Sequence, residues 1–340
     1  MKFKDITNKS KIIYYTHIDL DGVGCAVLLK DVLKDVEPKL NRKHINYNEI
    51  DEEIDFISNS INNYTHIIFT DLSFTEDQFV KLVDVVIANP NTQFFVLDHH
   101  KTCFFNNHTE MNKLDNLEII FSNKYSATKL FYRRLTTEYD ISKYDKFIEL
   151  VDVRDLWRED DLALKEKADR LNLLSILLNF DGTITRFLTN PNVEETNNEK
   201  DIINNEINIS REKINKLISS LNVYIDDNNH YFAYIDSPEV ALASNTANSI
   251  LNAIYALKTN DIVPDMYGSF VDNIKSIKDI EKVEYVAIKL IYGTVSLRSN
   301  KKVSDFDVSA IAKACNGGGH SQAAGCPADI FLTKYSMIKN

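Results

Sequence analysis

The chain has 340 residues, a formal net charge of −11 and 44% hydrophobic residues. That length allows two ordinary domains, and the composition is typical of a globular protein that can bury a core. A protein that binds long nucleic acid through its phosphates needs many Lys and Arg contacts, so the negative charge argues against long duplexes as partners.

Neither a membrane nor an oxidising compartment is indicated. No apolar run approaches the roughly 18 to 20 residues that span a bilayer, and the N-terminal MKFKDITNKS lacks the apolar region of a signal peptide. The four cysteines form no C-x-x-C pair and no metal-type spacing, which favours a reducing compartment. We therefore expect a cytoplasmic protein with no membrane partner.

The first half of the chain alternates strand and helix patterns. Thr75 and Gln78 have the spacing of a capping box, and apolar residues follow them at helical intervals. Such alternation predicts a parallel sheet with helices on its faces, and hence an α/β fold. Strands are expected at 11–16, 42–47, 66–70, 95–97 and 117–121, and helices at 23–33, 75–88 and 126–138.

The second half restarts this alternation after a polar segment. A helix over 143–157 carries Asp152 and Asp155, and 160–178 is also expected to be helical. The Asn- and Glu-rich stretch 181–220 favours an interdomain segment that closes in a connecting helix. Beyond it we expect strands at 231–236, 283–292 and 294–298 and helices up to 257 and at 308–314. The expected parts are a domain at 1–180, a linker at 181–225 and a smaller α/β domain at 226–340.

Polar residues follow three of the expected strands at their C-terminal ends. Parallel strands align these ends at one edge of the sheet, so the side chains can converge in space. A solvated polar turn is the plain alternative for one such motif, but three strands that end alike make it a weak explanation. The residues are His17, Asp19 and Asp21 after the first strand, Asp71 after the strand at 66–70, and Asp98, His99 and His100 after the strand at 95–97.

These residue types indicate a metal site. Carboxylates with one or two imidazoles suit Mn²⁺ or Mg²⁺, whereas a structural Zn²⁺ site is expected to use Cys. Several carboxylates can hold two ions about 4 Å apart, which activates a water and stabilises the oxygens of a phosphoryl displacement. No Ser or Cys nucleophile is set against a base here, so covalent catalysis is the weaker alternative. The pattern favours hydrolysis of a phosphoester.

A glycine run near the C-terminal end is the second distinctive motif. Gly317, Gly318 and Gly319 precede His320, and glycines without a Cβ let backbone N–H groups approach an anion closely. A following helix N-terminus would add favourable charge. We therefore expect the three glycines to bind an anionic substrate, with a flexible turn as the alternative.

Taken in order, these motifs resemble the DHH phosphoesterase family with its DHH-associated C-terminal domain. The resemblance implies a two-domain, Mn²⁺-dependent phosphodiesterase or phosphatase with its site in the cleft between the domains. Members include hydrolases of short oligonucleotides and bisphosphate nucleotides, cyclic-dinucleotide phosphodiesterases, RecJ-type single-strand exonucleases and exopolyphosphatases. The matching segments are HIDLDG at 17–22, Asp71, DHH at 98–100, DLW at 155–157, SLRS at 296–299 and GGGH at 317–320.

The resemblance also implies roles for single residues. Asp71 would bridge two metal ions, and Asp98 and His100 would orient ligands or contact substrate. Arg298 would form a phosphate fork, although a lone Arg is usually just surface, and His320 would bind substrate. The metal ligands would be His17, Asp19, Asp21, Asp71, His99 and Asp155.

The roles of Asp152 and Ser126 each have more than one interpretation. Asp152 lies about one helical turn before Asp155 and could replace it, support it, or be a solvated carboxylate. Ser126 could face the same cleft, but a plain helix N-cap is the simpler interpretation.

The expected function is hydrolysis of short single-stranded oligonucleotides or small nucleotides. The expected cofactor is two Mn²⁺ ions, with Mg²⁺ as the alternative ion. A homodimer is compatible with this function. A RecJ-type exonuclease is the runner-up, disfavoured by the acidic charge and by the absence of a further nucleic-acid-binding domain after residue 340. An exopolyphosphatase is a further alternative. A catalytically silent nucleotide-binding regulator would show lost ligands, and none is lost in this sequence.

Overall fold

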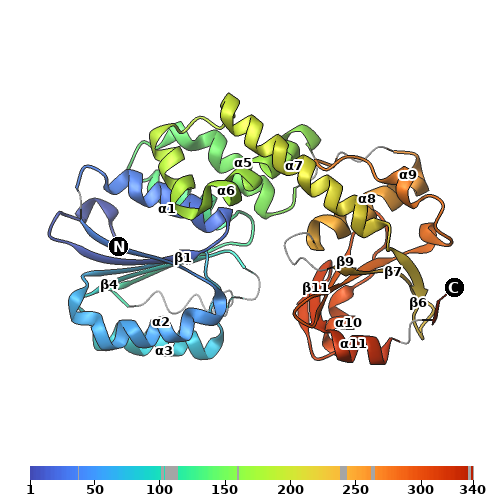
Figure 1. Cartoon of the computed structure of the whole chain (residues 1–340). Helices are drawn as coiled ribbons and strands as arrows, with labels where there is room; N and C mark the ends of the chain where they lie inside the picture. Colours follow the sequence, from blue (N-terminus) through green and yellow to red (C-terminus); the bar gives the residue numbers. More distant parts are fainter. Residues whose placement is uncertain are drawn as a thin grey trace. The chain divides into compact units, whose positions relative to one another are not determined.

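The computed structural model of the chain describes residues 1–36, 38–100, 103, 114–158, 161–237, 243–261, 265–335 and 338–339. The chain forms two compact units, Met1–Glu199 and Lys200–Asn340 (Figure 1). Helix α7 (Asn197–Ile218) crosses the division, within the range 181–225 where the sequence predicts a linker with a connecting helix. Within the described ranges, no helix is long and apolar enough to cross a membrane.

Unit 1 is built around a parallel sheet, as the sequence predicts. The register aligns Thr16 of β1, Thr70 of β3 and Leu97 of β4 in one row near the C-terminal ends of these strands. Residues that follow these strands therefore share one edge of the sheet. In the described part of the unit the strand order is β2 (Lys39–Ile45), β1 (Lys11–His17), β3 (His66–Thr70), β4 (Gln93–Asp98) and β5 (Leu117–Phe121).

This strand order creates a topological switch point between β1 and β3. The chain runs from β1 outward to β2 and then returns to the other side of β1 to lay down β3, β4 and β5. Open α/β sheets bind ligands in the crevice outside the carboxyl ends of the strands at such a point. The fold thus places the residues after β1 and β3 where a binding site is expected.

Both faces of the sheet are buried. Successive residues of a strand point to opposite faces, so Tyr14 and Tyr15 of β1 enter different cores, and neither has exposed surface. Figure 1 shows helices on both sides of the sheet. One face carries α1 (Leu20–Leu33), α4 (Ala127–Leu135), α5 (Asp145–Asp155) and α6 (Leu162–Thr189), and the other carries α2 (Ile50–Ser60) and α3 (Glu76–Ala88).

The capping box before α3 is confirmed. The Gln78 backbone N–H donates to Thr75 Oγ1 over 3.3 Å, and the Thr75 N–H donates to Gln78 Oε1 over 3.0 Å. These two bonds satisfy N–H groups that have no partner inside the helix.

Three elements of unit 1 differ from the prediction. Helix α2 is not predicted, although Ile50, Ile54 and Ile57 recur at helical spacing and are buried. Strand β2 lies at 39–45, because a short 3-10 helix at Tyr47–Glu49 ends the extended chain. Helix α6 continues past the predicted end at 178, across a break at Asn179. There φ is 59° and the side-chain oxygen accepts the Gly182 N–H over 3.1 Å, which caps the second part.

Unit 2 contains a mixed sheet. Strands β7 (Tyr231–Ser237) and β8 (Tyr285–Leu290) pair in parallel, and the pairings described for the other strands are antiparallel. The rings of Phe232 and Tyr285 stack 5.2 Å apart in the core of this unit. Across its described residues the order is β10 (Gly318–His320), β11 (Ala323–Pro327), β9 (Thr294–Ser299), β8, β7, β6 (Asn222–Ile225) and β12 (Ile338–Lys339).

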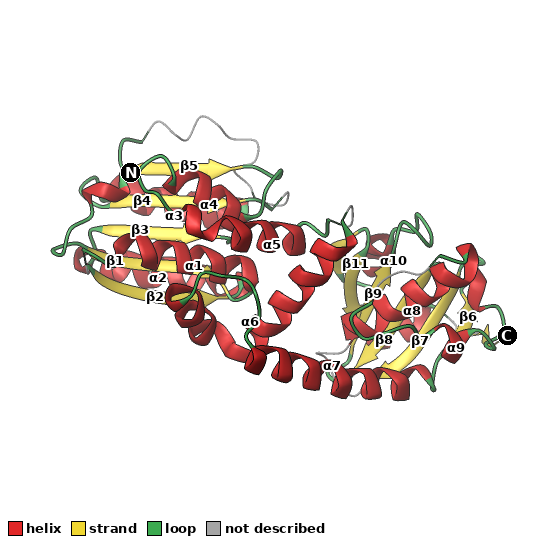
Figure 2. Cartoon of the chain, turned by 90° about the horizontal axis from the view of Figure 1, so that it is seen from above, coloured by secondary structure: helices red, strands yellow, loops and turns green. Residues whose placement is uncertain are grey.

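Helices cover both faces of this second sheet. Helix α8 (Ala243–Thr259) packs against β8 and β9, and α10 (Val308–Ala314) and α11 (Ala328–Lys334) close the core around Phe232. Figure 2 shows α8 crossing over these strands. The sequence predicts α8 and α10 but neither α11 nor β6.

The glycine run forms a strand, which corrects one expectation. Gly318 pairs with Gly325 and Gly319 with Ala324 in the β10–β11 hairpin, and the next element is β11 rather than a helix. A Cβ on Gly317 would lie 2.1 Å from the Gly325 carbonyl oxygen, and Gly319 has a φ of 137°. Close backbone approach and positive φ therefore require glycine at these two positions.

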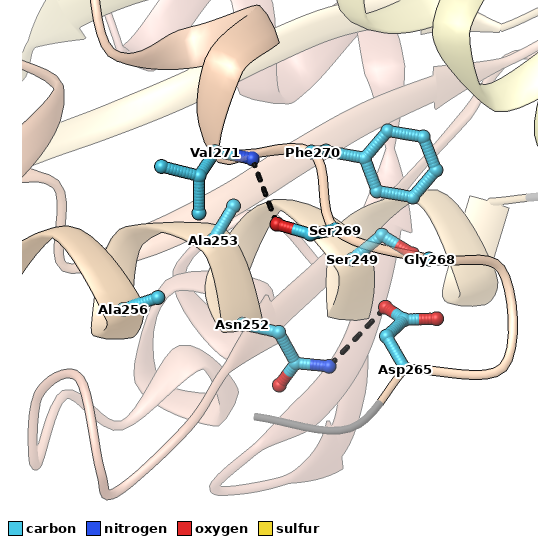
Figure 3. A pocket seen from close by; sticks show the side chains of 9 residues that line it. All are labelled: Ser249, Asn252, Ala253, Ala256, Asp265, Gly268, Ser269, Phe270 and Val271. Atoms are coloured by element: carbon cyan, nitrogen blue, oxygen red, sulfur yellow. Dashed lines mark hydrogen bonds between the residues drawn. The ribbon is translucent and has the colours of Figure 1, made fainter. Parts of the chain in front are cut away.

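A small pocket opens beside α8 (Figure 3). Asn252 Nδ2 donates to Asp265 Oδ2 over 3.3 Å, and the Val271 N–H donates to Ser269 Oγ over 3.4 Å. None of the substrate-binding residues predicted from the sequence lines it, so it is not the expected phosphate site. The lining residues are Ser249, Asn252, Ala253, Ala256, Asp265, Gly268, Ser269, Phe270 and Val271.

The close contact of β1 with the start of α1 gives a first prediction. A Cβ on Gly22 would lie 2.1 Å from the His17 carbonyl oxygen, so Gly22→Ala must push the helix away from the strand. We expect a loss of about 1–3 kcal/mol in the free energy of unfolding, as overpacking causes, measured by urea denaturation. Gly318→Ala is the matched control, because a Cβ there meets nothing within 4 Å. Equal effects of the two substitutions would contradict the steric account.

Candidate metal centre

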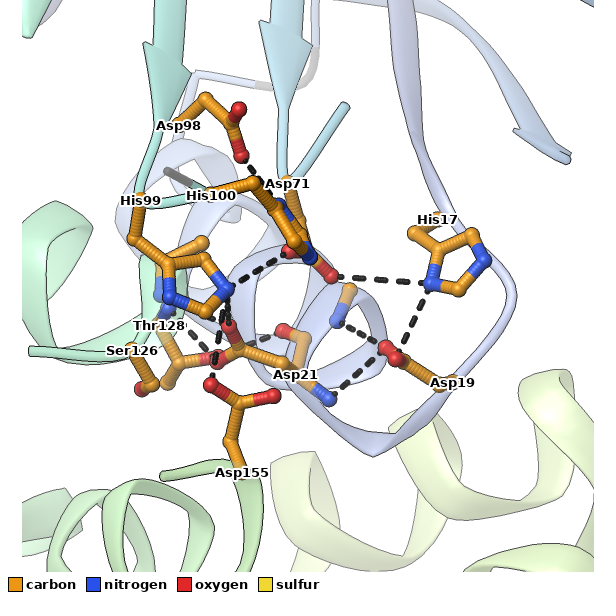
Figure 4. A network of polar contacts seen from close by, with 12 residues as sticks. His17, Asp19, Asp21, Asp71, Asp98, His99, His100, Ser126, Thr128 and Asp155 are labelled. Atoms are coloured by element: carbon orange, nitrogen blue, oxygen red, sulfur yellow. Dashed lines mark hydrogen bonds and ion pairs between the residues drawn. The ribbon is translucent and has the colours of Figure 1, made fainter. Parts of the chain in front are cut away.

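Acidic and imidazole side chains converge at the C-terminal edge of the sheet in unit 1 (Figure 4). They come from the ends of β1, β3 and β4 and from the last residue of α5, Asp155. The ligand atoms within each group lie within 4.8 Å of one another. The groups are His17, Asp19 and Asp71; Asp21, His99 and Asp155; and Asp71, Asp98, His99 and His100.

Asp71 lies between the first two groups. Its Oδ2 is 3.9 Å from His17 Nδ1, and its Oδ1 is 3.5 Å from His99 Nε2. His17 Nδ1 is also 2.9 Å from Asp19 Oδ2. His99 Nε2 is 3.6 Å from an oxygen of Asp21 and 3.4 Å from one of Asp155. Each oxygen of Asp71 therefore faces a different set of candidate ligands.

The backbone of Asp71 is held in an uncommon conformation. Its φ is 58°, in the left-handed region that residues other than glycine rarely adopt, and its N–H donates to the Leu97 carbonyl over 2.9 Å. Such conformations persist only where the surrounding structure imposes them, and they cluster at functional sites. Here the turn directs the carboxylate back across the strand ends.

Several buried atoms of the cluster lack a hydrogen-bond partner among the described residues. They include both oxygens of Asp71, Nε2 of His99 and Oδ2 of Asp155. Buried polar atoms in folded proteins are nearly always paired, so a group of orphans aimed at one another calls for an ion. Oxygen and imidazole nitrogen atoms are ligands of Mn²⁺ and Mg²⁺, and the set fits a divalent cation.

The electrostatics of the cluster fit the same conclusion. Burial, with the negative charges of Asp19, Asp21 and Asp155, raises the pKa of Asp71 well above its ordinary value. Burial and the charge of Asp21 raise the pKa of Asp155 to about 9. Burial lowers the pKa of His99, which keeps its imidazole in the neutral form that binds metals. Added positive charge at this point would stabilise all three side chains in their ligand forms.

Helix α4 holds Asp21 in place. The N–H groups of Ala127 and Thr128 donate to its two carboxylate oxygens over 2.6 and 2.8 Å, and the Thr128 hydroxyl donates to the Asp21 carbonyl over 2.5 Å. A carboxylate is favoured at a helix N-terminus, where N–H groups are unpaired and the helix dipole is positive. Gly24 permits this approach, because a Cβ there would lie 2.3 Å from Thr128 Oγ1. Neither Ala127 nor Thr128 is predicted from the sequence to belong to the site.

Asp152 belongs to the supporting structure. It is buried, and it accepts the Ser126 N–H over 2.9 Å and the Lys129 ammonium over 2.8 Å, with Arg158 Nη2 at 3.1 Å. Both carboxylate oxygens thus have partners, and Asp152 is in none of the metal-compatible groups of the described residues. The solvated-carboxylate interpretation is wrong, because the side chain is buried. Ser126 is the N-cap of α4, since its Oγ accepts the Lys129 N–H over 3.3 Å.

Asp98 and His100 contact each other, and His100 also contacts Tyr47. His100 Nδ1 lies 2.7 Å from Asp98 Oδ1, and its Nε2 lies 3.1 Å from the Tyr47 hydroxyl. Burial lowers the pKa of His100, but the hydrogen bond and charge of Asp98 outweigh it, and the pKa is raised. The ring of Tyr47 also stacks on His17 with centres 4.6 Å apart. Tyr47 thus joins two residues of the site.

The sequence gives little sign of Tyr47. It lies in a polar stretch just after β2, and only the parallel alignment of β2 with β1 brings it to the same edge as His17. Its position as an aromatic residue at the end of the expected strand 42–47 is the one signal that could have found it.

In unit 2, Arg298 lies on β9 and is partly buried. Its Nη2 donates to Ser244 Oγ over 2.8 Å and its Nη1 to the Leu297 carbonyl over 2.9 Å. Among the described residues it has no carboxylate partner, and burial lowers its pKa. Arg298 and His320 are both in register with Ala323 of β11, but the side chain of His320 lies outside the described part of the structure. A half-buried guanidinium without a carboxylate is suited to an anion.

Known proteins resemble this chain along most of its length. No family model matches it. The oligoribonuclease NrnB of Bacillus subtilis is 27% identical over 324 residues, covering 92% of this chain and 71% of that protein. Exonuclease RecJ bound to manganese has a TM-score of 0.57 at 14% identity, covering 97% of this chain and 89% of that one. The DHH domain of a member of the s1p family of ribosomal proteins has a TM-score of 0.58 at 14% identity, covering 95% and 86%.

The fold and the site define an α/β protein with a candidate metal centre at the switch point of a parallel sheet. The ordered motifs and the relatives agree with that description. Together they indicate a phosphoesterase of the DHH type.

The orphaned oxygens of Asp71 give a second prediction. In the metal-free protein, Asp71→Asn removes a buried carboxylate that lies among others of like charge, and the new amide can donate to them. We expect the free energy of unfolding to rise by about 1–3 kcal/mol without metal, and the stabilisation by added Mn²⁺ to disappear. Thermal denaturation with and without Mn²⁺ measures both effects.

Asp152→Asn is the control for this experiment, because Asp152 is equally buried but fully paired. It should lower the stability of the metal-free protein and leave the Mn²⁺-dependent gain intact. A loss of metal-free stability in Asp71→Asn would contradict the interpretation that Asp71 is a metal ligand.

Tyr47 gives a third prediction. Tyr47→Ala removes the ring that stacks on His17, whereas Tyr47→Phe removes only the hydroxyl that contacts His100. Partners that orient a metal-binding imidazole typically change metal affinity by about 10- to 100-fold. We expect Mn²⁺ titration calorimetry to show such a loss for one of two ions in Tyr47→Ala and little change in Tyr47→Phe. If the two variants lose affinity equally, the hydroxyl and not the ring is what matters.

Proposed function

We propose that this chain is a two-metal-dependent phosphodiesterase that hydrolyses short oligonucleotides or small nucleotides. The observation that carries the proposal is Asp71, whose two unpaired oxygens face two different ligand sets. The mixed carboxylate and imidazole ligands favour Mn²⁺, with Mg²⁺ as the alternative. The manganese in the similar RecJ structure supports that choice of ion.

The residues would divide between two ion sites that share Asp71. His17 and Asp19 would complete one site, and Asp21, His99 and Asp155 would complete the other. Two ions held in this way would supply an activated water and positive charge for the attacking and leaving oxygens of an in-line displacement. Helix α4 would keep Asp21 in position throughout, through the N–H groups of Ala127 and Thr128.

Asp98 and His100 would act beside the ions. Asp98 fixes the tautomer of His100 by accepting from Nδ1, so Nε2 is directed to the Tyr47 hydroxyl. In this arrangement His100 can contact a phosphate oxygen or a leaving group while Asp98 stays buried. We therefore assign His100 to the substrate and Asp98 to its orientation.

Arg298 would bind a second phosphate of the substrate. Its guanidinium lacks a carboxylate partner among the described residues, and a planar fork matches two phosphate oxygens. Gly318 would complete this anchor, because a Cβ there meets nothing within 4 Å and its backbone is open to a ligand. Gly317 and Gly319 would shape the hairpin that carries Gly318, and His320 would add a further contact to the substrate.

The oligoribonuclease activity of the similar Bacillus subtilis protein supports short substrates, whereas the likeness to RecJ favours a single-strand exonuclease. A panel separates these functions: a dinucleotide, single strands of increasing length, a bisphosphate nucleotide and inorganic polyphosphate, each with Mn²⁺. We expect turnover to fall steeply once strands exceed a few residues. Efficient processive cleavage of long strands would favour the exonuclease, and hydrolysis of polyphosphate alone would favour an exopolyphosphatase. No hydrolysis of any substrate would indicate a silent nucleotide-binding regulator.

The anchor role of Arg298 gives a fourth prediction. Arg298→Ala should raise KM for a dinucleotide and leave kcat and Mn²⁺ affinity unchanged, as loss of uniform binding does. Arg298→Lys keeps the charge but loses the two-pronged geometry, so it should fall between the wild type and Arg298→Ala. Steady-state kinetics of the three proteins test this. Equal losses in kcat and kcat/KM with an unchanged KM would mean that Arg298 acts only in the transition state.

The homodimer and the cytoplasmic location expected from the sequence stay predictions.

A further inference from the structure

Trp157, the only tryptophan of the chain, lies two residues after the candidate metal ligand Asp155. It follows the last turn of α5, where the Leu156 N–H donates to the Asp152 carbonyl and the Arg158 N–H donates to the Val153 carbonyl. Of its surface, 58% is exposed. A large aromatic side chain therefore projects from the turn that delivers a ligand to the metal centre.

The local structure does not explain why this residue is a tryptophan. Its φ is 53°, in the left-handed region, and the position just after a helix end with such a φ is usually a glycine. A bulky side chain is an outlier there, since the Cβ is crowded against the backbone. The indole is also too exposed to serve as core packing. Backbone geometry and burial would both favour another residue, which indicates a function for the ring.

The ring is oriented before any ligand binds. The guanidinium carbon of Arg154 lies 4.9 Å from the centre of the Trp157 ring, within the range of a cation–π contact. Arg154 Nε is in turn 3.5 Å from Asp169 Oδ1 of helix α6. The ring thus lies against a guanidinium that is itself paired with helix α6, while most of its surface stays in solvent. An oriented aromatic ring loses little conformational entropy when it stacks on a ligand.

Positive groups lie near this turn on a chain that is acidic overall. Arg154 and Arg158 flank Trp157 in the sequence, and Arg158 Nη2 donates to the Lys124 carbonyl over 3.1 Å. Lys129, which shares Asp152 with Arg158, and Arg133 lie over the ring of Tyr125, at 5.3 and 5.0 Å from its centre. Trp157 beside Arg154 therefore has the two elements that bind single-stranded nucleic acid, a ring that stacks on bases and a cation that attracts phosphates.

We propose that Trp157 is a stacking platform for a nucleobase next to the scissile phosphate. The proposal rests on the proposed function, and it deepens it by making a base part of what the enzyme recognises. Stacking is tolerant of base identity, because every base has a π face. The site would therefore accept different bases but would discriminate against polyphosphate and other phosphoesters without a base.

Because Trp157 is the sole tryptophan, its fluorescence reports on this one position. The test titrates the full chain in Mg²⁺, which does not quench as Mn²⁺ does, with a hydrolysis-resistant phosphorothioate diguanosine dinucleotide. The matched ligand is the same dinucleotide backbone without its bases. We expect saturable quenching by the first and no quenching by the second. Binding of the dinucleotide, seen by calorimetry, without any change in fluorescence would overturn the proposal, as would equal quenching by the abasic ligand.

Two variants test the same proposal by kinetics. Trp157→Gly suits the left-handed backbone, so it should fold with at least the thermal stability of the wild type. It should raise KM for dinucleotides by about 5- to 150-fold, the range that corresponds to loss of one base stack, and leave kcat and Mn²⁺ affinity unchanged. Trp157→Phe, which keeps a ring under the same backbone strain, should restore most of the affinity.

The outcomes separate this proposal from the proposed function. An unchanged KM in Trp157→Gly, in an enzyme that hydrolyses dinucleotides, would overturn the stacking platform alone. An equal rise in KM for the abasic substrate would also overturn it, because the effect would then be structural. If the wild type binds dinucleotides with quenching but hydrolyses none of them, the platform stands and the proposed function fails.

Discussion

The structure of unit 1 depends on the burial of several carboxylates at one edge of a parallel sheet. Asp21 and Asp71 are nearly inaccessible, and Asp155 is close by. Like charges in a medium of low dielectric repel one another strongly, so this arrangement costs stability unless protons or cations neutralise it. The raised pKa values of Asp71 and Asp155 express that cost. A site that is unfavourable without positive charge is, for the same reason, a site with high affinity for it.

Contacts with the remainder of the unit hold these carboxylates close to one another. The N-terminus of α4 holds Asp21, the N–H of Asp71 bonds to the Leu97 carbonyl in a left-handed turn, and Asp98 bonds to His100. Asp152 supports the arrangement from behind, because it pairs with Lys129 and Arg158 and accepts from the backbone at the start of α4. Two acids separated by one turn of helix therefore differ in their surroundings. Asp155 Oδ2 has no hydrogen-bond partner among the described residues and lies 3.4 Å from His99 Nε2, whereas both oxygens of Asp152 are paired.

In unit 1, Asp71 and Asp155 have carboxylate oxygens without hydrogen-bond partners among the described residues, whereas unit 2 contains a cation, Arg298, without a carboxylate partner in the described structure. Arg298 is half-buried in a β-sheet, bonded to a hydroxyl and a carbonyl, and short of a carboxylate partner in the described structure. In the proposed function, the negative centre of unit 1 would need metal ions before a phosphate could approach it, whereas Arg298 would bind a phosphate directly. Trp157 adds a third kind of contact, since its exposed ring can recognise the part of a nucleotide that carries no charge.

The sequence by itself determined the parallel sheet and which acidic and imidazole side chains meet at its C-terminal edge. Strand patterns that end in His17, Asp71 and Asp98 are local signals, and parallel pairing brings such ends together whatever the details of packing. The capping box at Thr75 and Gln78 is equally local, since both partners lie within one turn.

Only the tertiary structure decided the rest. The hydrogen bonds from α4 to Asp21 join residues about a hundred positions apart in the sequence. Tyr47 contacts His17 only because β2 pairs with β1 in this register. The glycine run became a strand because its backbone packs against Gly325 and Ala324, which no pattern within the run records. Asp152 is paired because Lys129 and Arg158 lie beside it. Their positions depend on the packing of helices that are distant in the chain.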